Sequence, residues 1–107
     1  MPWTDVADAA QVAAAGMFEA EAAGAALLLY DVAGVIYATA AVCPHHSAWF
    51  SQGGISGEFV DCPRHQGRFH IPTGRQVRGP ECPALRTYKV RVEAGRVFVD
   101  VESPSAA

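Results

Sequence analysis

Residues 43–45 are Cys-Pro-His and residues 62–65 are Cys-Pro-Arg-His, and sixteen residues separate the two stretches. Each stretch supplies one thiolate and one imidazole, so the candidate ligands are Cys43, His45, Cys62 and His65. A site with two sulfur and two nitrogen ligands suits only a few metal centres. The leading one is a [2Fe–2S] cluster in which the cysteines bind one iron and the histidines bind the other.

Zinc is the alternative, because it also binds two cysteines together with two histidines. Zinc fingers usually place like ligands together, with two cysteines on one turn and two histidines on a helix. Here each stretch supplies one ligand of each kind, and no helical pattern surrounds either histidine. A mixed pair from each loop suits a two-iron cluster, since each loop can then reach both irons. The spacing alone favours iron–sulfur and leaves structural zinc open.

The third cysteine, Cys82, stands between Glu81 and Pro83, apart from both pairs. It is expected to pack as a small apolar side chain rather than to bind metal. In a reducing compartment, cysteines close to histidines are more often metal ligands than disulfide partners. The cysteine usage therefore favours a metal centre over a disulfide framework.

Composition and charge exclude several function classes. At 107 residues, the chain is expected to form one domain, too small for an enzyme with a deep substrate cavity. A formal net charge of −3 provides no basic surface for nucleic acid. No basic segment followed by an apolar run begins the chain, and its longest apolar stretch, residues 22–30, is too short to span a bilayer. We expect a soluble, cytoplasmic protein with neither a nucleic-acid nor a membrane partner.

Most of the remaining sequence predicts short strands separated by turns, the pattern of an all-β sandwich or barrel. Residues 25–30 are a continuous apolar run, which suits a strand covered on both faces. Residues 88–92 alternate between apolar and charged side chains, as a half-buried strand does. Further strands are expected at residues 35–38, 59–61 and 97–101, with turns at 31–34, 56–58 and 93–96.

Two segments differ from this pattern. Residues 7–15 are rich in alanine and predict at most one or two turns of helix. Residues 42–83 contain all three cysteines, all four histidines and five of the seven prolines, so they are expected to depend on a metal centre for order. We interpret them as a small cluster-binding lobe within a domain of residues 1–102, followed by a flexible tail at 103–107.

The residues around both pairs closely resemble the Rieske ferredoxins of bacterial aromatic-ring dioxygenase systems. Beyond the pairs, the resemblance includes residues 36–38, 66–69, 73–74, 79–80 and 85–90. It covers most of the chain, although the first twenty residues match only loosely. It implies an all-β fold, a Rieske-type antiparallel β-sandwich with a small inserted cluster-binding lobe.

The resemblance also implies a role for each ligand. Cys43 and Cys62 would hold the inner ferric ion, while His45 and His65 would hold the outer, redox-active iron through the ring nitrogen nearer the backbone. Residues 79–80, Gly-Pro, would belong to a proline-containing loop that covers the cluster. Arg64 departs from the tryptophan or leucine that relatives often carry, and its effect stays open.

Missing residues predict a low reduction potential. Respiratory Rieske proteins clamp their cluster loops with a disulfide, and the matching positions here are Ala48 and Arg64. They also place a serine and a tyrosine near the cluster as hydrogen-bond donors, where this chain has Gly67 and Phe69. Fewer hydrogen bonds to sulfur stabilise the reduced cluster less. We expect a midpoint near about −150 mV, the lower end for this class.

By resemblance, the chain is a one-electron carrier and not itself an enzyme. It would take electrons from an NAD(P)H-dependent flavoprotein reductase and pass them to a terminal Rieske oxygenase. No flavin motif, phosphate-binding loop or second iron site is present in the sequence. The alternatives are a non-redox zinc module and a nitrite reductase small subunit, which shares the fold but often lacks the ligands.

Two aromatic residues follow the first ligand pair, and two more histidines flank the pairs. Trp49 is the better candidate for docking to a redox partner, whereas Phe50 could equally shield the cluster from water. His46 is expected to face solvent because adjacent residues in an extended loop point in different directions. His70 is expected at the surface of a strand that leaves the second pair.

Overall fold

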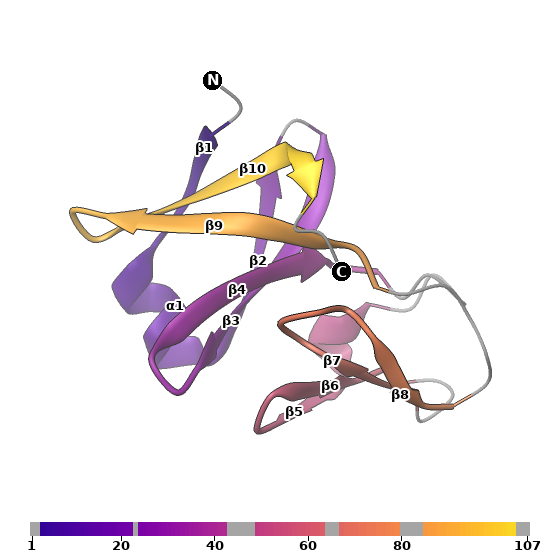
Figure 1. Cartoon of the computed structure of the whole chain (residues 1–107). Coiled ribbons are helices and arrows are strands. Elements are labelled where there is room, and N and C mark those ends of the chain that lie inside the picture. Colours follow the sequence, from indigo (N-terminus) through magenta and orange to yellow (C-terminus); the bar gives the residue numbers. More distant parts are fainter. Residues whose placement is uncertain (1–2, 23, 43–48, 64–66, 80–84, 105–107) are drawn as a thin grey trace.

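Two antiparallel sheets, packed against each other, form the computed structural model, which describes residues 3–22, 24–42, 49–63, 67–79 and 85–104 (Figure 1). The elements are β1 (Trp3–Asp8), α1 (Ala9–Ala15), β2 (Met17–Ala22), β3 (Ala25–Val32), β4 (Val35–Ala40), η1 (Phe50–Gln52), β5 (Gly54–Ser56), β6 (Phe59–Asp61), β7 (Arg68–His70), β8 (Gln76–Arg78), β9 (Thr87–Glu93) and β10 (Arg96–Pro104). Within the described ranges, a six-stranded sheet has the order β1-β10-β9-β4-β3-β2, and a four-stranded sheet has the order β5-β6-β7-β8. The predicted antiparallel all-β architecture is confirmed.

The two predicted hairpins of the larger sheet form where turn residues accept a left-handed backbone. Ala33 and Gly34 join β3 to β4 with φ angles of 52° and 87°. Ala94 and Gly95 join β9 to β10 with φ angles of 51° and 78°. Two successive positive φ angles characterise the tight turns whose twist matches that of antiparallel strands. Both expected strand–turn–strand units are confirmed.

Strand β3 lies at the centre of the core, as its continuous apolar run predicted. Leu28 and Tyr30 pack with Phe50, Val60 and Phe69, which belong to η1 and the smaller sheet. Leu27 and Leu29, on the opposite face, pack with residues of α1 and of the other strands of the larger sheet. Because its side chains alternate between two packed layers, every residue from Leu27 to Tyr30 is fully buried.

Helix α1 confirms the short helix expected in the alanine-rich segment. The Asp8 carboxylate accepts a hydrogen bond from the Ala10 N–H at 2.8 Å, which caps the amino terminus. Gly16 ends the helix with a φ of 80°, and its N–H donates to the Val12 carbonyl at 2.8 Å. Val12 is fully buried, so tertiary packing stabilises a helix too short to persist alone.

Burial decreases along β9, and this differs from the half-buried strand that the alternation predicted. Tyr88 is buried, whereas the Val92 side chain is 46% exposed. β4 pairs with β9 only at Thr87 and Tyr88, so the rest of β9 has β10 as its paired strand and projects as a hairpin (Figure 1). The alternation was therefore correct for strand structure, but not for burial at the tip.

At its far end, β10 continues to Pro104, two residues into the segment expected to be a tail. The domain boundary at residue 102 stays a prediction. Among the described residues, the structure has no helix of sufficient length and hydrophobicity to cross a bilayer.

A buried phenol links β3 to β4. The Tyr30 hydroxyl lies 2.7 Å from Thr39 Oγ1, and the Thr39 hydroxyl donates to the Ala40 carbonyl at 2.9 Å. Removal from water raises the pKa of Tyr30 far above its ordinary value, since no charge compensates a phenolate there. The folded protein therefore holds this proton more tightly than the unfolded chain does.

This difference predicts a loss of stability in alkali. The contribution of Tyr30 is complete below the ordinary phenol pKa of about 10 and falls as the pH rises above it. Between about pH 8 and pH 11, the free energy of unfolding should decrease more for the parent than for Tyr30→Phe, which has no phenol to titrate. Denaturant unfolding at both pH values measures this, and equal decreases in the two proteins would contradict it.

Candidate metal centre

Of the four predicted ligands, the described residues include Cys62. Its side chain is 4% exposed, immediately follows β6 and forms no disulfide. Cys43, His45 and His65 lie outside the described residues, as do His46, Ala48, Arg64 and Cys82. Their ligand and non-ligand roles stay predictions.

The second ligand stretch connects two paired strands. The Cys62 N–H donates to the Gly67 carbonyl at 2.7 Å, directly beyond the last pair of β6 and β7, Asp61 with Arg68. This hydrogen bond closes the base of the loop that contains the second ligand stretch. Cys62 and Gly67 are both buried, so the base of the loop is fixed against the core.

The first ligand stretch is closed in a similar way. Val42, which precedes this stretch, and Trp49, four residues after it, form an antiparallel bridge. Beside them, the Phe50 N–H donates to the Ala41 carbonyl at 2.9 Å. Each ligand stretch therefore lies between two residues that are joined by a backbone hydrogen bond, Ala41 with Phe50 and Cys62 with Gly67.

An aromatic pair joins the bases of the two stretches. Phe50 follows the first stretch and Phe69 follows the second, and their ring centroids lie 5.5 Å apart at 84°, edge to face. Both rings are buried in the same cluster as Cys62. The fold thus brings together the bases of the two predicted ligand loops, as a shared metal centre requires.

Gly79, directly after β8, brings a third part of the chain close to the second ligand stretch. Its φ is +109°, and a Cβ at this position would lie 2.7 Å from the Cα of Gly67. Glycine is required here because the backbone approaches so closely. Further along the chain, the Leu85 N–H donates to the Gly74 carbonyl at 2.8 Å. Gly79, which is predicted to belong to the loop that covers the cluster, thus lies close to Gly67 at the base of the second ligand loop.

Trp49 and Phe50 have different environments, and this decides between their suggested roles. Trp49 is 41% exposed, whereas Phe50 is fully buried. A docking role for Phe50 is therefore excluded, because its ring is buried in the same core cluster as Cys62. Trp49 remains accessible to a partner.

The positions expected to lack hydrogen-bond donors are also buried. Phe69 packs edge to face with Phe50, and Gly67 has no side chain. Neither supplies a polar side-chain group to its surroundings. The low potential stays a prediction.

His70 is more constrained than a simple surface residue. It is partly buried, with Nδ1 2.9 Å from Thr73 Oγ1 and Nε2 2.8 Å from Glu58 Oε1. It bridges the β5–β6 turn and the turn after β7. With both ring nitrogens engaged, His70 has a structural role.

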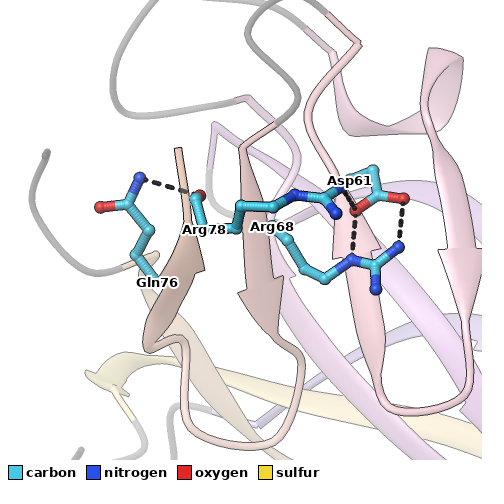
Figure 2. Close-up of polar contacts among 4 residues, drawn as sticks. All are labelled: Asp61, Arg68, Gln76 and Arg78. Atoms are coloured by element: carbon cyan, nitrogen blue, oxygen red, sulfur yellow. Dashed lines mark hydrogen bonds and ion pairs between the residues drawn. The ribbon is translucent and has the colours of Figure 1, made fainter. Parts of the chain in front are cut away.

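An ion-pair group that the sequence analysis missed lies next to Cys62. Asp61, Arg68 and Arg78 form it, on three adjacent strands (Figure 2). Hydrogen bonds from the Arg68 guanidinium hold the pKa of the Asp61 carboxyl below its ordinary value. Spacing in the sequence could not reveal the group, because its members meet only when β6, β7 and β8 pair.

The donor chemistry fits an iron–sulfur centre. A buried, unoxidised cysteine at the base of a closed loop is suited to bind metal as a thiolate. In the part of the chain that the structure describes, no group of three or more His, Cys, Asp or Glu side chains is placed to form a separate metal site. The two predicted loops are thus where the ligands are expected.

Known proteins support the same identification. Residues 2–89 match the family model of the Rieske [2Fe-2S] domain. The chain is 36% identical over 99 residues to the ferredoxin component of the naphthalene 1,2-dioxygenase system of Pseudomonas aeruginosa. The aligned residues cover 92% of this chain and 95% of that relative.

Solved structures agree. Sphingomonas yanoikuyae B1 ferredoxin has a TM-score of 0.85 at 30% identity, over 91% of this chain and 96% of that one. A chain in the complex of reduced oxygenase and oxidized ferredoxin in carbazole 1,9a-dioxygenase has a TM-score of 0.84 at 31% identity, over 92% and 93% of the two chains. The likeness spans almost the whole length of these relatives.

Proposed function

This chain belongs to the Rieske [2Fe–2S] ferredoxins of aromatic dioxygenase systems, and we propose that it carries electrons from an NAD(P)H-dependent flavoprotein reductase to a terminal aromatic-ring oxygenase. As a ferredoxin component, it is an electron carrier with one Rieske cluster. The cofactor is therefore an iron–sulfur cluster rather than zinc. We also propose a cytoplasmic location, because the proposed reductase would draw on NAD(P)H.

The observation that carries the proposal is the near full-length likeness to a chain in a solved oxygenase–ferredoxin complex. A carrier must bind a cluster rigidly and present it to two partners in turn. Here the closed bases of both ligand stretches and the Phe50–Phe69 pair beneath them supply that rigidity. When bound, the cluster supplies reversible one-electron chemistry. We propose Cys43, His45, Cys62 and His65 as its ligands.

A reconstituted turnover assay tests the proposal. The purified holoprotein is titrated into a mixture of NAD(P)H, a flavoprotein ferredoxin reductase, a terminal oxygenase from the same organism and an aromatic substrate. Product should form only when the chain is present, and the rate should rise with its concentration until the oxygenase is saturated. Product formation that is independent of the chain, with its cluster left oxidised, would refute the carrier role.

Trp49 is expected to contribute to docking. Its side chain is 41% exposed and adjoins the first ligand stretch, and exposed tryptophans often dominate the affinity of interfaces. Trp49→Ala should slow electron transfer to the oxygenase by about tenfold while leaving the midpoint potential unchanged. Stopped-flow reduction of the oxygenase by the pre-reduced chain measures this rate.

Val92→Ala is the matched control, since Val92 is also an exposed apolar residue but lies at the tip of the β9–β10 hairpin. It should transfer electrons at the parental rate. Equal rates for Trp49→Ala and the parent would exclude Trp49 from docking.

A further inference from the structure

Three charged side chains form a row across the smaller sheet, at the strand ends from which the predicted cluster loops leave. Asp61 on β6 pairs in register with Arg68 on β7, and Arg68 pairs in register with Arg78 on β8. Cys62 follows Asp61, Gly67 precedes Arg68, and Gly79 follows Arg78. The row therefore lies next to the base of the second ligand loop and to Gly79.

Asp61 lies at the β6 end of the row, and both arginine side chains extend toward its carboxylate (Figure 2). Arg68 Nε donates to Asp61 Oδ1 at 2.7 Å, and Arg68 Nη2 donates to Oδ2 at 3.1 Å, a bidentate pair. Arg78 Nη2 lies 3.8 Å from the same Oδ1. The Asp61 and Arg68 side chains are 28% and 29% exposed, so solvent screens their charges only in part.

The carboxylate offsets a repulsion. Two arginines directly opposite each other on neighbouring strands disfavour pairing, because like charges destabilise cross-strand contacts. Asp61 contacts both guanidinium groups and compensates one of their two charges. This keeps β8 against β7, and the Gly67–Gly79 approach depends on that pairing.

The row also places charge beside a predicted ligand. Asp61 is bonded through the main chain to Cys62, and the three side chains together carry a net charge of +1. A reduced cluster is more negative than an oxidised one, so each nearby charge shifts the equilibrium between them. Removing a positive charge should lower the midpoint potential, and removing a negative charge should raise it.

We propose that Asp61, Arg68 and Arg78 are positioning residues that hold the ends of β6, β7 and β8 together beside Cys62 and tune the midpoint potential of the cluster. This inference rests on the proposed carrier function and on Cys62 as a ligand. It adds a set of residues, none of them a ligand, that controls how the ligand loops are closed.

Two charge-neutralising variants, studied singly and together, test the tuning by protein-film voltammetry of the holoprotein. Arg68→Gln should lower the midpoint and Asp61→Asn should raise it, each by about a threefold change in the redox equilibrium, or about 28 mV at 59 mV per tenfold. The double variant should return close to the parent, because one charge of each sign is lost. Shifts in the same direction for both single variants, or no shift in either, would overturn the tuning role.

Loop closure has a separate readout, the rate at which visible absorbance is lost in the presence of an iron chelator. Asp61→Asn should lose its cluster several-fold faster, and adding Arg78→Gln should slow that loss by removing the repulsion between the two arginines. Arg68→Lys keeps the charge but not the bidentate geometry. It should lose the cluster faster at a nearly parental potential, and it carries the test if Asp61→Asn fails to fold. Parental loss rates in Arg68→Lys would overturn the closure role.

The Asp5–Arg96 pair is the matched control. Arg96 Nε and Nη2 donate to the Asp5 carboxylate between β1 and β10, in the larger sheet. Asp5→Asn and Arg96→Gln should leave the potential and the cluster-loss rate unchanged; effects as large as those at Asp61 would overturn the proposal. If the Asp61 and Arg68 variants show the expected shifts but the parent protein supports no turnover in the reconstituted assay, the carrier function alone is refuted.

Discussion

Replacing Cys62 by alanine is expected to abolish cluster binding. The iron and labile sulfide contents should fall from about two of each per chain to near zero, and the visible absorption should disappear. Cys62 is a buried thiol at the closed base of the second loop. If it is a ligand as proposed, its removal would take half of the protein ligands from one iron. Iron and sulfide analysis of the purified variant measures the loss.

Cys82 supplies the control, because it is expected to pack as an apolar side chain rather than to bind metal. Cys82→Ala should keep the parental iron content. A Cys62→Ala protein that retains both irons would contradict the ligand assignment, whereas a parent protein that contains zinc in place of iron would contradict the iron–sulfur cofactor.

Gly74→Ala is expected to destabilise the protein by about 2–5 kcal/mol. Its φ of +76° alone costs an alanine about 1–2 kcal/mol, and forcing an atom into a packed site costs about 1–3 kcal/mol more. A Cβ would lie 2.0 Å from the Leu85 carbonyl oxygen, which is main chain and cannot rotate away. The substitution should therefore displace Leu85 and break the 2.8 Å hydrogen bond from its N–H to Gly74. Denaturant unfolding measures the change.

Gly24→Ala separates backbone strain from the steric clash. Gly24 has a nearly identical φ of +80°, but a Cβ there would meet no atom within 4 Å. It should cost only the about 1–2 kcal/mol of the left-handed backbone. Equal destabilisation by the two substitutions would show that the close approach of Gly74 to Leu85 contributes nothing.

Local patterns in the sequence predicted the framework well. The apolar run at residues 25–30 indicated a strand covered on both faces, because only such a strand has no polar side to its alternation. Turn residues at both hairpins indicated where the chain reverses. The predicted burial of Val92 was wrong because β4 pairs with only the first residues of β9. The sequence of β9 does not contain that information.

The candidate site was predictable in its chemistry but not in its supports. Spacing between cysteines and histidines, with the resemblance, predicted four ligands, and their assignment stays a prediction. Phe50 and Trp49 are adjacent in sequence, and only the fold shows that one ring is core and the other is surface. Likewise, Asp61 and Arg78 become neighbours only after three strands pair, so pattern alone could not connect them.

Protein-film voltammetry of the purified holoprotein tests the central claim most directly. The claim is that this Rieske ferredoxin is a low-potential, one-electron carrier. Its cluster is expected to receive few hydrogen bonds from side chains, because Gly67 and Phe69 provide no side-chain donor. We predict a single reversible one-electron wave with a midpoint near about −150 mV. A midpoint above about +100 mV, in the range of the high-potential members of this class, would contradict it.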